Sequence, residues 1–150
     1  MAENILVALS NLPSLYPIYL SLNHKDYLTT FSLLFVSTFS FLSHLVENHK
    51  HGMPGIGVPR AISHFLNRLD VLGCLFVSSR LAYLYYNKFG FAIGQHKTLL
   101  LIHSLPFIPL RISEYDKYNL NLKPMYIVTH SLWHISIFLS LGSFLSKLIY

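Results

Sequence analysis

Three long stretches without a charged residue constrain the fold of this chain more than any other feature. Asp, Glu, Lys and Arg are absent from residues 5–22, 27–46 and 124–145. A helix of about 20 apolar residues crosses the roughly 30 Å hydrocarbon core of a bilayer, and ionised groups are costly to bury there. Charged residues make up 11% of the chain, whereas an average soluble domain has about 25%. The three stretches therefore predict membrane-spanning helices.

The middle of the chain is less regular but still apolar. Residues 61–86 form one long run whose charges are expected near its ends or facing inward, at Arg68, Asp70 and Arg80. Residues 98–112 form a shorter run interrupted by two prolines, which predicts a fourth, irregular span. The fold class is therefore an all-α polytopic transmembrane helix bundle forming a single domain, residues 1–150. Its five predicted spans lie near residues 5–22, 27–46, 61–86, 98–112 and 124–145.

Local signals refine this layout. Pro13 and Pro17 predict a kink in the first span. The segment 47–60 is rich in glycine and proline, which predicts a loop. This loop contains Glu47, His49 and His51, and we interpret it as facing lipid headgroups or lining the rim of a pocket.

Composition narrows the classes of partner and of metal site. The net charge is +5, but Lys and Arg lie mostly singly between apolar runs, which favours contact with lipid headgroups and not with nucleic acid. A single cysteine, Cys74, excludes an intramolecular disulfide and a thiolate cluster. Any metal must then be bound by histidine and carboxylate. We expect an integral, multi-pass membrane protein, of the endomembrane system or the plasma membrane.

Five polar residues are predicted inside the spans at one depth. Ser40 and His44 are four residues apart near the end of the second span, and His130 and His134 have the same spacing near the start of the last. Four residues make about one helical turn, so each pair shares a face. Asp70 lies in the first part of the third span. Two spans between the second and the last place all five residues toward the same side of the membrane.

These residue types indicate a catalytic zinc site. Three histidines without a thiolate form a known zinc ligand set that leaves the fourth position to water, whose pKa falls to about 7. Asp70 is expected to accept a proton from that water or to hydrogen-bond a ligand imidazole. Ser40 is expected to hold the water or a developing oxyanion. A structural alternative stays open, in which Asp70 pairs with Arg68 or Arg80. We interpret His103 as a helix–helix hydrogen bonder.

The pattern Ser40-x-x-x-His44, Asp70, then His130-x-x-x-His134 on the last helix resembles the CREST superfamily of membrane hydrolases. That superfamily includes alkaline ceramidases, progestin/adiponectin receptors, GPI-processing proteins and the myomaker-like branch, which the last motif resembles most. The resemblance implies zinc bound by the three histidines, with Ser40 and Asp70 around its water. Members of the superfamily have seven core helices, so this chain resembles a shortened version with five.

We therefore expect a zinc-dependent intramembrane hydrolase of a lipid amide or ester, with a ceramide-, GPI- or phospholipid-like substrate. The alternative is a non-catalytic, zinc-stapled membrane protein that acts in membrane fusion or remodelling, or as a partner subunit. A proton or metal conduit is disfavoured, because the far half of the last span offers only serines as polar groups. A five-helix bundle is thin for enclosing a lipid, which favours a homodimer.

Overall fold

The computed structural model describes residues 1–149, and within them the chain is helical with no strand. The helices are α1 (Ala2–Leu9), α2 (Leu15–Asn23), α3 (Tyr27–Val46), α4 (Arg60–Phe89), α5 (Lys97–Ser104), α6 (Phe107–Ser113) and α7 (Lys123–Ile149). Two short 3-10 turns, η1 (Leu12–Ser14) and η2 (Leu120–Leu122), precede α2 and α7. The all-helical class predicted from the sequence is confirmed.

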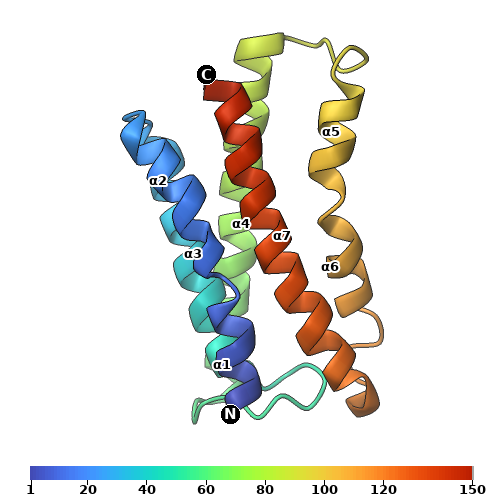
Figure 1. Ribbon diagram of the computed structural model, residues 1–150. Helices are drawn as coiled ribbons and strands as arrows, with labels where there is room; N and C mark the ends of the chain where they lie inside the picture. Colours follow the sequence, from blue (N-terminus) through green and yellow to red (C-terminus); the bar gives the residue numbers. More distant parts are fainter. Residues whose placement is uncertain (150) are drawn as a thin grey trace.

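The helices form five rods that run alternately in opposite directions (Figure 1). The first rod is α1 followed by α2, and the fourth is α5 followed by α6. In Figure 1, α7 runs through the centre of the bundle, with α1 to α3 on one side and α5 and α6 on the other. The main packing partners are α3 with α4, α7 with α6, and α3 with α1, followed by α7 with α2.

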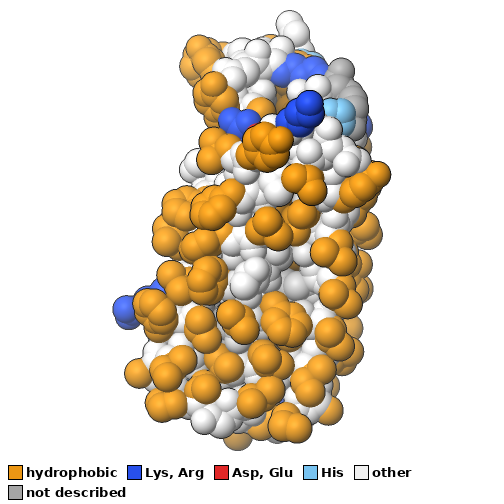
Figure 2. Space-filling view, turned by 90° about the vertical axis from the view of Figure 1, so that its left-hand side faces the viewer, with side chains coloured by type: hydrophobic (Ala, Val, Ile, Leu, Met, Phe, Trp, Pro, Cys, Tyr) orange, Lys and Arg blue, Asp and Glu red, His pale blue; other side chains and the backbone are white. Residues whose placement is uncertain are grey.

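Three segments are long and apolar enough to cross a membrane, namely Ala2–Asn23, Tyr27–Val46 and Leu120–Ile149. They contain the three charge-free stretches of the sequence. Hydrophobic side chains cover most of the face shown in Figure 2, while Lys and Arg gather mainly near its top. The crossing of the bilayer by α4 and by the α5–α6 rod stays a prediction, although both rods run beside these segments (Figure 1).

Prolines break two of the rods where the sequence predicts irregularity. Pro13 lies in the η1 turn, and Pro17 lies in the first turn of α2, where a missing backbone donor costs little. The fourth rod is interrupted at Pro106, between α5 and α6. The break between α1 and α2 leaves Ser10 and Asn11 outside both helices, and both side chains reach α7.

The close packing of α3 on α4 is fixed by a small residue and an ion pair. A Cβ atom on Gly73 would lie 2.8 Å from the Val36 Cα, so only glycine allows this approach. Toward the other end, the Arg80 Nη2 donates to the Asp26 carboxylate at 2.8 Å. Asp26 also caps α3 by accepting from the Thr29 backbone N–H. Arg80 therefore pairs with Asp26 and not with Asp70.

The loop between α3 and α4 is more buried than the sequence indicates. We interpreted Glu47 and His51 as parts of a headgroup-facing or rim loop, but they are 0% and 1% exposed. The Asn4 side chain from α1 donates to the carbonyls of His44 and Glu47 at 2.8 and 2.9 Å. The His51 ring lies between the carbonyls of Ser113 and Asn119. Segments distant in sequence therefore cover this loop.

Candidate metal centre

Three buried imidazoles converge between α3 and α7. His44 lies in the last turn of α3, and His130 and His134 lie one turn apart on α7. Their exposed fractions are 1%, 4% and 3%. The Nε2 atoms of His44 and His130 are 3.2 Å apart. One ring nitrogen from each of the three histidines lies within 4.8 Å of the other two. This group could hold a metal ion.

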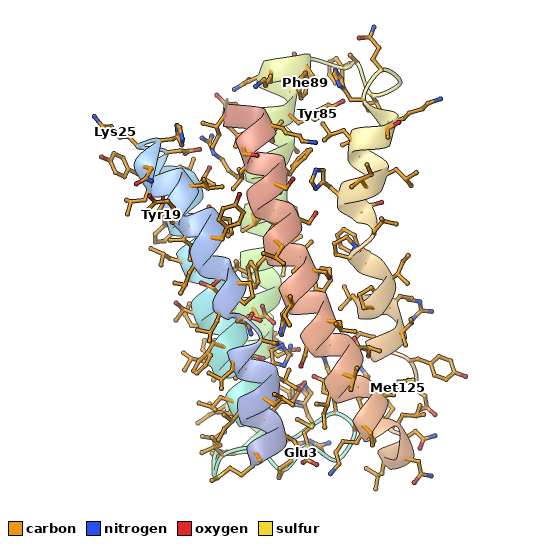
Figure 3. All side chains as sticks on the ribbon, viewed as in Figure 1. Glu3, Tyr19, Lys25, Tyr85, Phe89 and Met125 are labelled. Atoms are coloured by element: carbon orange, nitrogen blue, oxygen red, sulfur yellow. The ribbon has the colours of Figure 1, made fainter. Side chains whose placement is uncertain are left out.

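The cluster lies in the half of the bundle that contains the N-terminus (Figure 1). In Figure 3, Glu3 and Met125 mark the nearer end of the bundle, and Tyr85 and Phe89 mark the opposite end. The last turn of α3 and the first half of α7 therefore meet at one level. This follows from the two rods between them, which return the chain to the end of the bundle where α3 finishes.

The hydrogen-bond partners of the α7 histidines define which ring nitrogen carries the proton. The Ser113 hydroxyl donates to the Leu110 carbonyl at 2.7 Å, so its oxygen is left to accept from the His130 Nδ1–H at 2.9 Å. Because Nδ1 carries the hydrogen, the lone pair of His130 lies on Nε2.

His134 and His44 have the same tautomer. The Ser10 hydroxyl donates to the Val7 carbonyl at 2.6 Å and accepts from the His134 Nδ1–H at 2.8 Å. The Glu47 carboxylate accepts from the His44 Nδ1–H at 3.3 Å. All three rings thus have Nε2 as the acceptor, and the Ser40 hydroxyl lies 3.4 Å from that of His134. Two lone pairs 3.2 Å apart in a buried site repel each other, and a bound cation relieves that repulsion.

Glu47 is a site residue that the sequence reasoning missed. Its Oε2 atom accepts hydrogen bonds from His44 and from the Tyr126 hydroxyl, and the Lys50 Nζ lies 3.7 Å from its Oε1. Burial raises the pKa of Glu47, but the bonds from His44 and Tyr126 and the charge of Lys50 outweigh it and lower the pKa to about 2. Glu47 is therefore ionised and orients the His44 ring.

Ser40 and Asp70 lie beside the three histidines, on the wall of a shared cavity. The Ser40 hydroxyl is 3.4 Å from the His134 Nε2, and Asp70 lines the same cavity from α4. Asp70 does not hydrogen-bond a ligand imidazole, because other partners occupy the Nδ1 atom of each ring. The structure therefore brings together all five residues predicted from the sequence and leaves Asp70 facing the cavity.

The cavity has a volume of about 600 Å³, within the range of small-molecule sites. Its walls come from α3, α4, α5, α6 and α7. The end nearest the α3–α4 loop is charged, and Lys50 and Glu114 form an ion pair there at 2.9 Å. The rest is mostly apolar, with Leu81, Leu100 and Phe144 among its lining residues. A site with one charged end and one apolar end suits an amphiphile.

The chain resembles a virus protein along its whole length. It is 50% identical over 151 residues to an uncharacterized protein of Acanthamoeba polyphaga mimivirus, and the match covers 99% of each chain. No protein-family model matches the chain. No solved structure matches it either. Identity at this level over the full length shows common descent, so the chain belongs to the same family as this mimivirus protein.

Proposed function

We propose that this chain is a zinc-dependent intramembrane hydrolase that cleaves a lipid amide or ester. The observation that carries the proposal is the convergence of three buried imidazoles, each with one ring nitrogen within 4.8 Å of the others, beside an amphiphilic cavity. Three imidazoles without a thiolate are a ligand set of catalytic zinc. Two nitrogens bound to one tetrahedral zinc lie about 3.3 Å apart when each bond is about 2.05 Å. The 3.2 Å between His44 and His130 fits that spacing.

The reaction is hydrolysis at a carbonyl carbon. Zinc, when bound, supplies a Lewis acid and lowers the pKa of water toward about 7. The oxygen of water bonds to the carbonyl carbon, and the carbon–nitrogen or carbon–oxygen bond of the lipid breaks. The Asp70 carboxylate accepts the proton of the water and returns it to the departing amine or alkoxide. The Ser40 hydroxyl donates to the oxyanion that forms. The products are a carboxylic acid and an amine or an alcohol.

Three further features support a lipid substrate. The cavity lies among helices of which two, α3 and α7, belong to segments apolar enough to cross a membrane, so its apolar part is suited to an acyl chain. The charged end, with Lys50 and Lys117, suits a polar headgroup. The resemblance of the Ser40, His44, Asp70, His130 and His134 pattern to the CREST superfamily points to the same chemistry.

Glu47 is a positioning residue in this proposal, and its replacement tests the metal site. We expect Glu47→Gln to weaken zinc binding roughly 10- to 100-fold, because the neutral amide no longer fixes the His44 ring. The measurement is a zinc dissociation constant from chelator competition. Glu3→Gln is the matched control, since Glu3 pairs with Lys123 at the end of the bundle. Equal zinc affinity in the wild-type protein and in Glu47→Gln would show that Glu47 does not contribute to metal binding.

The experiment that tests the function combines elemental analysis with lipid profiling. We expect the purified protein to contain about one zinc per chain, as one three-histidine site holds one ion. Incubation with a membrane lipid extract should deplete one amide or ester class and release its free acid, as seen by mass spectrometry. A purified protein that is folded but contains no metal would contradict the proposal. A protein that holds zinc but turns over no lipid at any pH is instead a zinc-stapled membrane protein.

A further inference from the structure

Two walls of the cavity beside the metal centre come from rods that do not pack closely on each other. The helix α7 packs on α4, on α5 and on α6, whereas α4 makes no comparable contact with α5 or α6. His103 of α5 illustrates the difference. Its Nδ1 is 2.8 Å from the Ser140 hydroxyl and its ring packs on Phe144, and both partners belong to α7. The predicted helix–helix hydrogen bond of His103 is thus confirmed, and it ties α5 to α7.

The α5–α6 rod and α4 are held together near the ends of the bundle. At one end, Leu100 packs in the apolar cluster that contains Tyr85, and the His96 ring lies 6.1 Å from the Tyr85 ring, centroid to centroid. At the other end, the ion pair of Lys50 with Glu114 joins the α3–α4 loop to the end of α6. Between these levels, no hydrogen bond, ion pair or ring contact links α4 with α5 or α6 among residues 1–149. Figure 1 shows the two rods standing apart below the loop that joins them.

The separation of these rods opens the cavity to the outside of the bundle. Val71 of α4 and Phe107 of α6 both line the cavity and are 54% and 53% exposed. Cys74, about one turn after Val71, also lines the cavity and is exposed. The α7 wall is different, because Phe138 and Phe144 line the cavity and are both buried. A molecule outside the bundle therefore reaches the α7 wall through the gap between α4 and the α5–α6 rod.

The length of the cavity matches the thickness of one leaflet. On α4 its wall runs from Asp70 to Leu81, and these eleven helical steps correspond to about 16 Å. Half of the hydrocarbon core of a bilayer is about 15 Å thick. The charged end of the cavity lies near the last residue of α3, Val46, where a segment apolar enough to cross a membrane ends. The cavity therefore runs from the level of the lipid headgroups toward the middle of the bilayer.

We propose that the gap between α4 and the α5–α6 rod is an entrance through which one acyl chain of a bilayer lipid moves sideways into the cavity. The lipid comes from the leaflet beside the α3–α4 loop, so its headgroup stays at the charged end with Lys50 and Glu114. Its chain moves from lipid to apolar walls and is never exposed to water, so the transfer avoids the cost of hydrating apolar surface. This inference rests on the proposed function for the reaction at the carbonyl, and it adds the route by which the substrate arrives.

The test uses the full-length protein in phosphatidylcholine vesicles. A small fraction of the lipid has a photoactivatable diazirine at the end of one acyl chain. On illumination the diazirine loses nitrogen and attaches to residues in contact with it, which mass spectrometry identifies. We expect labels on Phe138 and Phe144, which the chain can reach only from within the cavity. Leu75 of α4 is exposed and lies outside the cavity wall, so its label reports contact with the surrounding lipid.

Cys74→Trp places a large ring in the entrance. It should reduce the labelling of Phe138 and Phe144 at least about fivefold, because an indole occupies much of the space that an acyl chain needs. Leu75→Trp is the matched control, since it adds the same ring at the next residue of α4, away from the cavity wall. This variant should label both phenylalanines at the wild-type level.

Two results would overturn the inference, namely wild-type protein without label on Phe138 and Phe144, or unchanged labelling of both in Cys74→Trp. Absence of label on Leu75 as well would overturn it too, because α4 would then lie outside the hydrocarbon. The wild-type result decides even if the variant does not fold. Failure of the proposed function has a different signature, because labelling needs neither bound zinc nor turnover.

Discussion

If the proposed function holds, we expect the replacement of His130 with alanine to remove the metal and the lipid turnover together. Only two imidazoles then remain, and a catalytic zinc site in a protein needs three protein ligands. We expect the zinc content to fall at least tenfold and turnover to fall to background, as measured by elemental analysis and lipid mass spectrometry on the same preparation. The free space left by the lost ring also lowers stability, so circular dichroism must show that the helices persist.

His96→Ala is the matched control for this variant. The His96 ring packs on Phe89, with centroids 4.1 Å apart, at the end of the bundle opposite the metal centre. It should therefore keep both zinc and turnover. If His130→Ala keeps its zinc, His130 is not a ligand. If it loses zinc but still hydrolyses lipid, the metal is not part of the reaction.

Asp70→Asn separates catalysis from metal binding. Asparagine has nearly the shape of aspartate but cannot accept the proton of water, and proton transfer of this kind contributes about 10²- to 10⁴-fold to rate. We expect kcat to fall by that factor while zinc content stays at the wild-type level. The Nδ1 atoms of the three rings contact Ser10, Glu47 and Ser113 and not Asp70, so the imidazoles keep their positions.

Arg68→Gln is a suitable comparison, because Arg68 is exposed, two residues away on the same helix and outside the cavity wall. It should turn over lipid at the wild-type rate. An Asp70→Asn variant with unchanged kcat would exclude Asp70 as the proton acceptor. Loss of zinc in that variant would make Asp70 part of the metal site instead.

Those parts of the fold that depend on residues close together in the sequence could be predicted. The cost of burying charge marks the long apolar helices, and the predicted stretch 27–46 coincides with α3 (Tyr27–Val46). The backbone restriction of proline marks the breaks at η1 and at Pro106. The burial of His51 could not be predicted, because its partners, the carbonyls of Ser113 and Asn119, come from a distant part of the chain.

Some residues of the candidate site could be predicted from the sequence, and others could not. His44, His130 and His134 could be predicted together because helical spacing and the number of intervening rods are both readable from sequence. Ser10 and Ser113, which set the ring tautomers, carry no such signal, since only tertiary packing brings them to the rings. Glu47 did carry one: it follows His44 by three residues at the end of α3, the spacing at which two side chains on a helix meet.

The residues of the candidate metal centre come from the beginning and from the last helix of the chain, and this has a consequence for biosynthesis. Ser10 and His44 leave the ribosome early, whereas His130 and His134 belong to the final rod. The three imidazoles can meet only after α4, α5 and α6, which lie between His44 and His130 in the sequence, have been made and α7 has packed on α3 in the correct direction. A chain that lacks α7 would lack two of the three imidazoles, so under the proposed function metal uptake would distinguish completely assembled molecules from incomplete ones.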